Sequence, residues 1–394
     1  MVKILKTDII NNLRNDDITY CMIAVTLLGL STGTAFPIIS LSLAGMSWLI
    51  SGRIAKIRSV CEQSWFYPVI LFFILPWMGL LFSKDPSLGT DYALKTKYLL
   101  IIFITAGLIL NQRRIQILVV FFVTGLLSGV FLSCLQLLGL MEQIQEGFWG
   151  WGTVHTLLSS YIVIGILITS FYFSRVKGVY KKIGILFVIV CLIFHLGILR
   201  GRGGYVVFLC VTPLIAQNMT VKLQFFKKLI VWLALIVFLL SFPMVRSRII
   251  WTINAVKVEY NSTVNGEQLT GKFVPRAFIY VSAYKVFKTS PIFGVGTGSL
   301  GYLTKKDGEM IEHPHNNLLY MGVSFGIIGF FSCLWLFWTM FRISWQSRGD
   351  PLGYFIASIC IVLFISGFFD TQILNTGTLI LLSLGYGLLN HLPR

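Results

Sequence analysis

Long runs of apolar residues constrain the fold of this chain more than any other feature of its sequence. A helix needs roughly 20 mostly apolar residues to cross the hydrocarbon core of a bilayer. About twelve segments approach that length and composition. Their approximate limits are 18–34, 37–51, 64–82, 98–111, 115–139, 154–174, 183–199, 203–217, 228–243, 317–341, 353–369 and 372–391. The sequence therefore predicts an all-α polytopic membrane protein with about twelve transmembrane helices.

The composition supports this interpretation and excludes several other classes of protein. Hydrophobic residues make up 56% of the 394 positions and charged residues 12%, whereas a soluble domain has about 25% charged residues. This balance excludes a soluble enzyme, a disordered protein and a nucleic-acid binder, in spite of the net charge of +17. The seven cysteines include no CxxC pair, so neither a disulfide framework nor a zinc site is indicated. Residues 1–17 are polar and mixed in charge, which predicts that no cleavable signal peptide is present.

The distribution of lysine and arginine predicts the orientation of the helices. If the N-terminus is cytoplasmic, 18 of these cations fall in cytoplasmic segments and 5 fall in the short outer loops. Positive residues concentrate in the cytoplasmic loops of membrane proteins, so both termini are expected on the inner side. The remaining nine cations lie in one long segment, 244–316, which would then face the outer side.

This arrangement predicts three parts along the chain. Residues 1–243 would form transmembrane helices 1–9, residues 244–316 an outer loop subdomain, and residues 317–394 transmembrane helices 10–12. Within the loop, residues 245–260 carry an apolar stripe that suits a helix at the membrane surface. A second helix is expected to begin at Pro275, because proline is favoured in the first turn. Its expected apolar stripe consists of Ala277, Tyr280, Val281, Tyr284 and Phe287.

Charged residues avoid the centres of the predicted spans, and His195 lies within the seventh span, a few residues from its outer end. Charges inside the membrane are costly and mark ion or proton pathways. Their absence argues against a proton pump and against an ion-coupled transporter, which needs such ligands near the midplane. The polar residues gather instead in three clusters on the outer side.

Two of these clusters contain arginine. Arg200 and Arg202 occupy a tight, glycine-rich turn between the seventh and eighth spans. The planar fork of arginine can hold two phosphate oxygens, so this turn is a candidate phosphate site; the alternative is contact with lipid headgroups. Arg276 follows Pro275 at the predicted start of a helix, where the dipole favours an anion. Arg276 would either bind an anionic ligand there or remain a solvated surface residue.

The third cluster runs from His313 to Asn317 and directly precedes the tenth span. Asparagine is a favoured helix cap, which explains Asn316 or Asn317 but not the two histidines. The helix dipole disfavours imidazolium, so a histidine here stays neutral and can accept a proton. Pro314 restricts His313 to an extended backbone, so the two rings should point in different directions. We therefore predict that His315 is a general base and that His313 supports it or contacts the substrate.

Asp370, at the outer end of the eleventh span, is the one carboxylate well placed to orient a histidine. The alternative is a lone aspartate at the membrane interface. The sequence has no DxD motif and no acidic pair suited to a divalent metal, so we expect neither a metal nor another cofactor. The stretch from Gly294 to Gly298 follows no strand and precedes no Walker lysine, and we interpret it as a flexible turn.

In this order, the clusters resemble those of the O-antigen ligase family, within the larger group of O-antigen polymerases, ligases and bacterial O-oligosaccharyltransferases. The resemblance extends to the topology, with about twelve spans, a large outer loop late in the chain and both termini inside. The similar motifs are Gly201-Arg202-Gly203-Gly204, Arg276, the turn Gly294 to Gly298, and His315-Asn316 with Gly322, Gly326 and Gly329. Arg200 and Arg202 compete for one family position, and the glycines that follow favour Arg202.

The resemblance implies a GT-C-like fold in the bacterial inner membrane, with an active site on the periplasmic face. It implies a glycan donor on undecaprenyl diphosphate and an acceptor hydroxyl on the lipid A–core of lipopolysaccharide. Arg202 and Arg276, with Arg200, would hold the diphosphate as it departs. His315 would accept the hydroxyl proton in a metal-independent, inverting transfer. The expected substrate-binding residues are Arg200, His313, Asn316 and Asp370.

Three other functions remain open at this point. An O-antigen polymerase would use the same chemistry with a glycan acceptor. The oligosaccharyltransferases of the same group often carry a long C-terminal soluble extension, which is not expected here. A transporter of lipid-linked sugars would need midplane charges or paired broken helices, and the sequence indicates neither. A structural scaffold would not need histidines and arginines collected on one side of the membrane.

Overall fold

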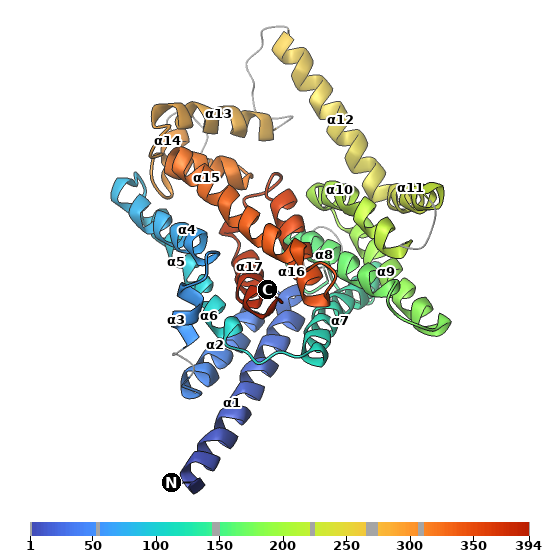
Figure 1. Cartoon of the computed structure of the whole chain (residues 1–394). Coiled ribbons are helices and arrows are strands. Elements are labelled where there is room, and N and C mark those ends of the chain that lie inside the picture. Colours follow the sequence, from blue (N-terminus) through green and yellow to red (C-terminus); the bar gives the residue numbers. More distant parts are fainter. Residues whose placement is uncertain are drawn as a thin grey trace.

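The computed structural model describes residues 2–52, 56–143, 150–220, 225–264, 275–305 and 311–393. Regular structure in these ranges is helical and includes no strand, which confirms the predicted all-α class. The α-helices are α1 Val2–Gly29, α2 Ala35–Ile50, α3 Lys56–Cys61, α4 Phe66–Gly79, α5 Pro86–Lys95, α6 Ile101–Ala106, α7 Gln112–Leu137, α8 His155–Phe173, α9 Val179–Ile198, α10 Arg202–Met219, α11 Phe225–Ser241, α12 Pro243–Val264, α13 Pro275–Thr289, α14 Ser299–Lys305, α15 Asn317–Gln346, α16 Pro351–Ser366 and α17 Thr376–Leu388. Figure 1 shows the C-terminus near the middle of the helical body and the N-terminus at the far end of α1.

Among the described residues, four helices are long and apolar enough to cross a membrane: α7, α8, α9 and α15. The pair formed by Phe226–Ser241 and Pro243–Ala255 also qualifies as one unit, but it is bent by 84°. Shorter apolar helices cover Ala35–Ile50, Phe66–Phe82 and Pro351–Ser366. Every predicted span contains helix, and several apolar helices agree with a multi-pass membrane protein. The full number of crossings and the three-part division of the chain stay predictions.

Helix α8 lies at the centre of the core. All its residues from Leu157 to Phe171 are buried, and it packs against α7, α9, α10 and α16. The Tyr161 ring contacts Phe122 of α7, and Phe122 contacts Phe355 of α16. A helix that is apolar on every side lies either in a protein core or in a membrane, and α8 lies in the core. This packing fixes the position of the first turn of α8, which carries the site described below.

Close contacts bring the starts of α10 and α15 to well-defined places. A Cβ atom on Gly204 would lie only 2.3 Å from the Cβ of Ser159, so glycine is needed for α10 to approach α8. The backbone N–H of Asn317 donates to the Gly367 carbonyl at 2.6 Å. The Asn317 side-chain oxygen accepts from the Ile373 N–H at 3.1 Å. The start of α15 is thereby tied to the segment that follows α16.

The glycine-rich turn at 294–298 is tightly packed, so its interpretation as a flexible turn is wrong. The Val295 N–H donates to the Val323 carbonyl at 3.0 Å. Gly294 has φ +73°, and a Cβ atom there would lie 2.3 Å from the backbone of Ser324. Helix α15 is kinked beside the turn, at Gly326 with φ +65°. The glycines allow two backbone segments to pack closely, and they do not make the turn flexible.

Both helices predicted in the long segment are present. Helix α12 projects from the body beside α10 and α11 in Figure 1. Helix α13 begins at Pro275 as expected, but the predicted apolar stripe describes its buried face only in part. Ala283 and Phe287 pack in a small cluster against α15, whereas Val281 and Tyr284 are exposed. The buried face of α13 is determined by its contacts with α14 and α15. It therefore cannot be predicted from the spacing of apolar residues within α13 alone.

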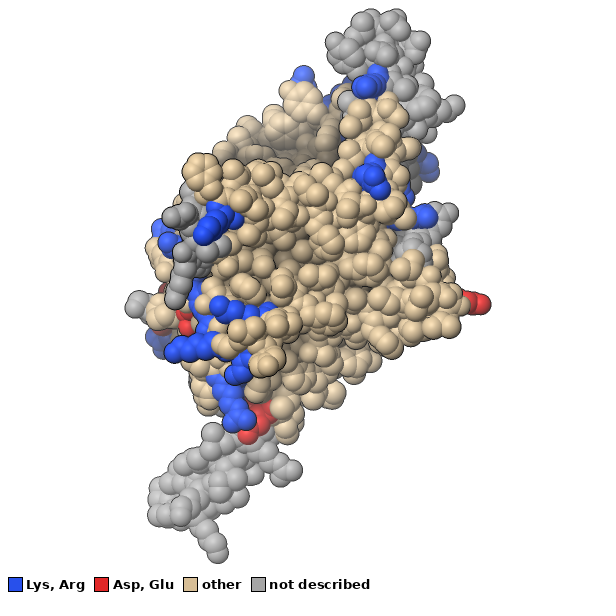
Figure 2. Space-filling model, turned by 90° about the vertical axis from the view of Figure 1, so that its right-hand side faces the viewer, with Lys and Arg blue, Asp and Glu red and all other residues tan. Residues whose placement is uncertain are grey.

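Charge is unevenly distributed over the surface of the helical body. Figure 2 shows lysine and arginine gathered toward the lower left and the upper right of one face, with a broad surface of other residues between them. Helix α9 lies on this side of Figure 1, and it exposes Ile183, Leu186, Phe187 and Val190. A wide apolar surface of this kind suits contact with lipid.

The predicted orientation can be measured with reporter fusions. Alkaline phosphatase, which is active only outside the cytoplasm, should be inactive when fused after Lys181 and active when fused after Lys257. The reason is that the lysines before α9 belong to a predicted cytoplasmic loop, whereas α12 belongs to the predicted outer segment. Activity after Lys181 would reverse the orientation and place the site on the inner side.

Candidate active site

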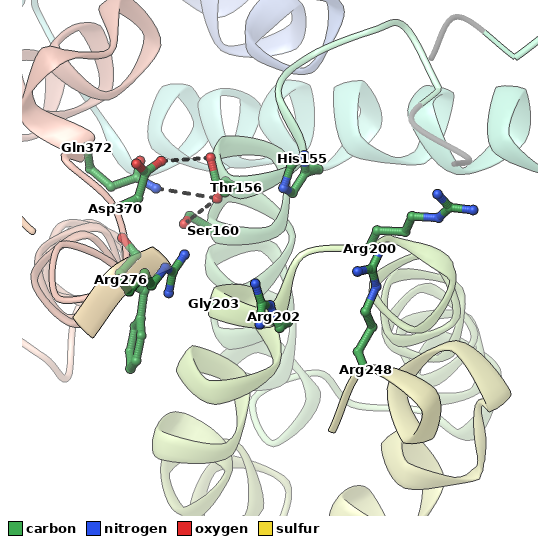
Figure 3. A pocket seen from close by; sticks show the side chains of 12 residues that line it. His155, Thr156, Ser160, Arg200, Arg202, Gly203, Arg248, Arg276, Asp370 and Gln372 are labelled. Atoms are coloured by element: carbon green, nitrogen blue, oxygen red, sulfur yellow. Dashed lines mark hydrogen bonds between the residues drawn. The ribbon is translucent and has the colours of Figure 1, made fainter. Parts of the chain in front are cut away.

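Four arginines line one cavity where α8 and α10 begin (Figure 3). Arg200 precedes α10, Arg202 is its first residue, Arg248 lies on α12 and Arg276 on α13. The volume is about 520 Å³, and we call this space the arginine cavity. Its other lining residues are His155, Thr156, Ser160, Gly203, Ser366, Phe369, Asp370 and Gln372. Four guanidinium groups beside a single carboxylate make the cavity cationic and suited to an anionic ligand.

Helix α12 holds Arg202 in place. The Nη1 of Arg202 donates to the Thr252 hydroxyl at 3.3 Å, and the guanidinium lies 4.7 Å from the centre of the Trp251 ring. Arg202 and Arg276 face one another in Figure 3, while the Arg200 side chain extends away from Arg276. This arrangement favours Arg202 as the partner of Arg276 in binding one anion.

A histidine–aspartate pair lies beside the arginine cavity. The Nδ1 of His315 is 3.2 Å from Oδ1 of Asp370, so the prediction that this carboxylate lies next to this histidine is confirmed. When Nδ1 carries the hydrogen and donates it to Asp370, the other ring nitrogen, Nε2, is left as an acceptor. About 38% of the His315 side chain is exposed, against 16% for Asp370. The histidine is therefore the accessible member of the pair.

The Asp370 carboxylate is bonded at both oxygens. The Thr156 hydroxyl donates to Oδ2 at 2.9 Å, and the Thr371 N–H donates to Oδ1 at 2.9 Å. Burial raises the pKa of Asp370, but hydrogen bonds from His315 and Thr156 outweigh burial and leave the pKa below its ordinary value. Asp370 is therefore ionised at neutral pH and stabilises positive charge on the imidazole.

His315 has a backbone conformation that is unusual for its residue type. Its φ is +49°, in the left-handed region that residues other than glycine seldom adopt. Such a conformation costs about 1–3 kcal/mol and persists where the surroundings enforce it, often at functional sites. Here the hydrogen bond to Asp370 and the adjoining start of α15 hold the residue.

The His313 and His315 rings form one contact. Their centres are 4.6 Å apart and their planes are perpendicular, at 89°, which agrees with the expectation that they point in different directions. Burial and the neighbouring His315 lower the pKa of His313, so its ring is neutral at pH 7. No described residue makes a hydrogen bond with the His313 Nδ1 atom. His313 can therefore support the His315 ring or meet a ligand.

A second cavity lies on the other side of the histidine–aspartate pair. Its volume is about 840 Å³, and we call it the histidine cavity. It shares His155, Thr156, Arg276 and Asp370 with the arginine cavity, so these four residues form a common wall. The residues that it alone contains include His313, His315, Glu312, Asp91, Tyr92, Lys95, Lys97 and Tyr98. Aromatic rings next to hydroxyl, carboxylate and ammonium groups offer both apolar faces and hydrogen bonds to a polar ligand.

Asn316 has a structural role in this structure. Its side-chain oxygen accepts from the Leu319 N–H at 3.0 Å and so caps α15, as the sequence pattern predicts. Its side-chain nitrogen donates to the Phe368 carbonyl at 3.4 Å. Asn316 lines neither cavity, so its predicted contact with substrate stays a prediction.

An apolar groove adjoins the arginine cavity between α10 and α12. Its volume is about 300 Å³, and it shares Arg202, Arg248 and Arg276 with the arginine cavity. The remaining wall includes Tyr205, Val206, Leu209, Ile249, Trp251, Ile253 and Ala255. A ligand with an anionic group at one end and a hydrocarbon chain at the other would fit the arginine cavity and this groove together.

Sequence reasoning missed several residues of the site, among them His155, Thr156 and Arg248. The predicted topology could have pointed to His155 and Thr156, because the sixth span begins at residue 154 on the outer side. A polar pair at that position lies on the same side as His315. Arg248 was one of nine cations in the long segment, and nothing in the sequence distinguishes it from Arg246.

Comparison with known families identifies part of the chain. The family model described as O-antigen ligase matches residues 186–334, and the resemblance read from the motifs is thereby confirmed over this segment. The segment contains all four arginines of the arginine cavity as well as His313 and His315. His155, Thr156 and Asp370 lie outside it. No curated protein matches the chain.

The lowered pKa of Asp370 predicts a pH-dependent contribution to stability. A carboxyl whose pKa is lower in the folded state stabilises the fold above its ordinary pKa, about 4, and loses that effect as the pH falls through the folded value. Asp370→Asn should therefore lower the thermal unfolding temperature of the detergent-purified protein at pH 7, and the difference from wild type should shrink in acid.

Asp350→Asn is the matched control, because Asp350 caps α16 and asparagine caps helices equally well. Its unfolding temperature should stay close to that of the wild type. A destabilisation by Asp370→Asn that does not shrink as the pH is lowered from 7 to well below 4 would contradict the charged hydrogen-bonded carboxylate.

Proposed function

We propose that this chain is a glycosyltransferase that transfers a glycan from undecaprenyl diphosphate to a sugar hydroxyl of the lipid A–core, the reaction of an O-antigen ligase. The observation that carries the proposal is that Asp370 lies in the wall shared by two cavities, one with four arginines and the other with its hydrogen-bonded partner His315. The O-antigen ligase match over residues 186–334 supports the same substrate class. The donor would occupy one cavity and the acceptor the other.

The donor would bind through its diphosphate. Arg202 and Arg276 face one another across the arginine cavity and can each hold phosphate oxygens with a planar fork. Arg248 and Arg200 add positive charge to the same wall. The isoprenoid chain would run into the apolar groove between α10 and α12, whose arginine end coincides with the arginine cavity.

The acceptor sugar would enter the histidine cavity. Tyr92 and Tyr98 offer aromatic faces, and Asp91, Lys95 and Glu312 offer hydrogen bonds that suit a polyhydroxylated ligand. His315 lines this cavity, so its free nitrogen can meet an acceptor hydroxyl. Binding both partners in fixed orientation supplies part of the rate acceleration.

The transfer would proceed in a single displacement. His315 Nε2 accepts the proton of the acceptor hydroxyl while the oxygen forms a bond to the anomeric carbon. The bond from that carbon to the diphosphate oxygen breaks on the opposite face, and the leaving group keeps the electron pair. Asp370 stabilises the imidazolium, the arginines stabilise the departing negative charge, and the anomeric configuration inverts.

No metal takes part in this scheme. Undecaprenyl diphosphate already carries the leaving group, and the arginines provide the positive charge that a divalent ion would otherwise supply. In the described part of the chain, His, Cys, Asp and Glu side chains do not gather in groups of three that could hold an ion.

An O-antigen polymerase is the second candidate, because it needs the same chemistry with a different acceptor. Deletion of the gene followed by electrophoresis of lipopolysaccharide separates the two. Loss of a ligase leaves bare core while the lipid-linked polymer accumulates. Loss of a polymerase leaves core that carries a single repeat unit, and this result would exclude the ligase.

Replacement of the two histidines should have different effects on transfer. His315→Ala removes the proposed base, and loss of a general base typically reduces the rate about 10²–10⁴-fold. His313→Ala leaves the His315–Asp370 pair intact and should retain measurable transfer. The assay is ligation of a lipid-linked donor to core acceptor by the purified variants, with donor binding measured alongside. His315→Ala protein that binds donor and transfers at a near wild-type rate would disprove the assignment of the base.

Substitution with lysine distinguishes the bidentate contact of arginine from the effect of its positive charge. Arg202→Ala and Arg276→Ala should nearly abolish transfer at normal protein abundance. The lysine variants keep the charge but lose the bidentate contact, and we expect about 10- to 100-fold less transfer, since a charged hydrogen bond contributes about 1.5–3 kcal/mol.

Arg246→Lys is the control for these variants, because Arg246 is exposed on α12 and does not line the arginine cavity. It should transfer like the wild type. Full activity of Arg202→Lys and Arg276→Lys would exclude a bidentate role and leave only a requirement for positive charge.

A further inference from the structure

A separate cavity lies near the opposite end of α8, away from both cavities of the candidate active site. It lies between α7, α8 and α9 and has a volume of about 790 Å³. Its lining residues are Gln116, Val119, Val120, Val123, Thr124, Leu127, Thr169, Tyr172, Val176, Lys177, Lys181, Gly184, Ile185 and Val188. We call this space the lysine cavity. The 19 residues of α8 extend about 28 Å, so nearly the length of that helix separates it from His155.

The wall of the lysine cavity changes from polar to apolar along the helices. Gln116 and Lys181 lie near the starts of α7 and α9, and Tyr172 lies near the end of α8, so these polar residues share one end of the cavity. Leu127 and Val188 lie further along their helices, where the wall is aliphatic apart from Thr124. One end of the cavity can therefore hold a charged group and the other a hydrocarbon chain.

The polar end is cationic and has groups available to a ligand. Lys177 and Lys181 are exposed, and neither forms an ion pair within the described residues. The Tyr172 hydroxyl is buried and has no hydrogen-bond partner among the described residues, so the two lysines are the groups that a ligand reaches first. Carboxylates do not line the cavity, so its charge favours an anion.

Part of the apolar wall is open because α9 carries a glycine there. A Cβ atom on Gly184 would meet no atom within 4 Å. The neighbouring Val188 packs against the core, and Val120 on α7 is exposed, so the space lies between a packed wall and the outer surface of the helices. A single hydrocarbon chain is the ligand shape that such a space accepts.

We propose that the lysine cavity binds an anionic phospholipid. Its phosphate would lie between Lys177 and Lys181, and one acyl chain would lie between α7 and α9 beside Gly184. The proposal rests on the polar-to-apolar gradient and on the charge of the polar end. Cationic pockets between transmembrane helices on the cytoplasmic side are suited to anionic headgroups, and the predicted orientation puts Lys177 and Lys181 on that side. This site is independent of the proposed transferase reaction.

Lipid titration of the detergent-purified protein tests this proposal. Phosphatidylglycerol should raise the thermal unfolding temperature in a saturable way, because a ligand that binds only the folded state stabilises it. Phosphatidylcholine with the same acyl chains should have a much smaller effect. Free sn-glycerol 3-phosphate, which has the charge without the chains, should have none.

Two substitutions of the polar end separate a specific site from general surface charge. Each lysine is expected to contribute about fivefold in affinity, so Lys177→Gln with Lys181→Gln should raise the half-saturating phosphatidylglycerol concentration about 25-fold. Lys182→Gln is the charge-matched control, because Lys182 lies over the Phe173 ring and does not line the cavity. It should bind phosphatidylglycerol like the wild type.

A third variant tests the apolar end. Gly184→Phe would place a ring in the open space beside α9 and should abolish the saturable shift while the protein remains folded. Gly349→Phe is the control, since Gly349 also has open space at its Cβ position but lies outside the cavity. Retention of the full shift by Gly184→Phe, or by the double lysine variant, would overturn the proposal. An equal shift of the unfolding temperature with phosphatidylcholine or with free glycerol phosphate would also overturn it. So would a loss of phosphatidylglycerol affinity in Lys182→Gln equal to that of the double lysine variant.

Discussion

The carboxylate of Asp370 joins the segments from which the site is made. It accepts hydrogen bonds from Thr156 on α8, from His315 before α15 and from the backbone of Thr371. A buried carboxylate is stable only when its oxygens are bonded, so each of these donors is required for the others to be well placed. The wall between the two cavities therefore depends on a single side chain. The unusual backbone conformation of His315 is one cost of this arrangement.

Much of the site was predictable because the relevant residues interrupt long apolar runs. Arg202, Arg276, His315 and Asp370 each lie near the end of a predicted span or helix, and counting spans places them on one side of the membrane. The helix cap at Asn316 follows from residue preference alone. These predictions use only local sequence and the order of segments, and both are fully available without a structure.

Other features depended on contacts that no local pattern contains. Thr156 matters because Asp370 lies beside it, and Arg248 because α12, which follows a bend of 84°, places it in the wall of the arginine cavity. The buried face of α13 follows from its packing on α15. The glycines around Gly294 were misread because the same residues suit a mobile loop and a tight contact between backbones, and only their neighbours distinguish the two.

The hydrogen bond between Thr156 and Asp370 joins residues that are 214 positions apart. A ribosome that adds about 5–20 residues per second needs roughly 10–40 seconds to make the intervening chain. During this interval α8 is already synthesised, and later the four arginines are too, while His315 still lacks its carboxylate. In the proposed reaction, the cationic residues for the donor would therefore be synthesised before the carboxylate that pairs with His315. If His315 acts as proposed, its pairing with a carboxylate becomes available only once the segment after α16, which carries Asp370, has been made.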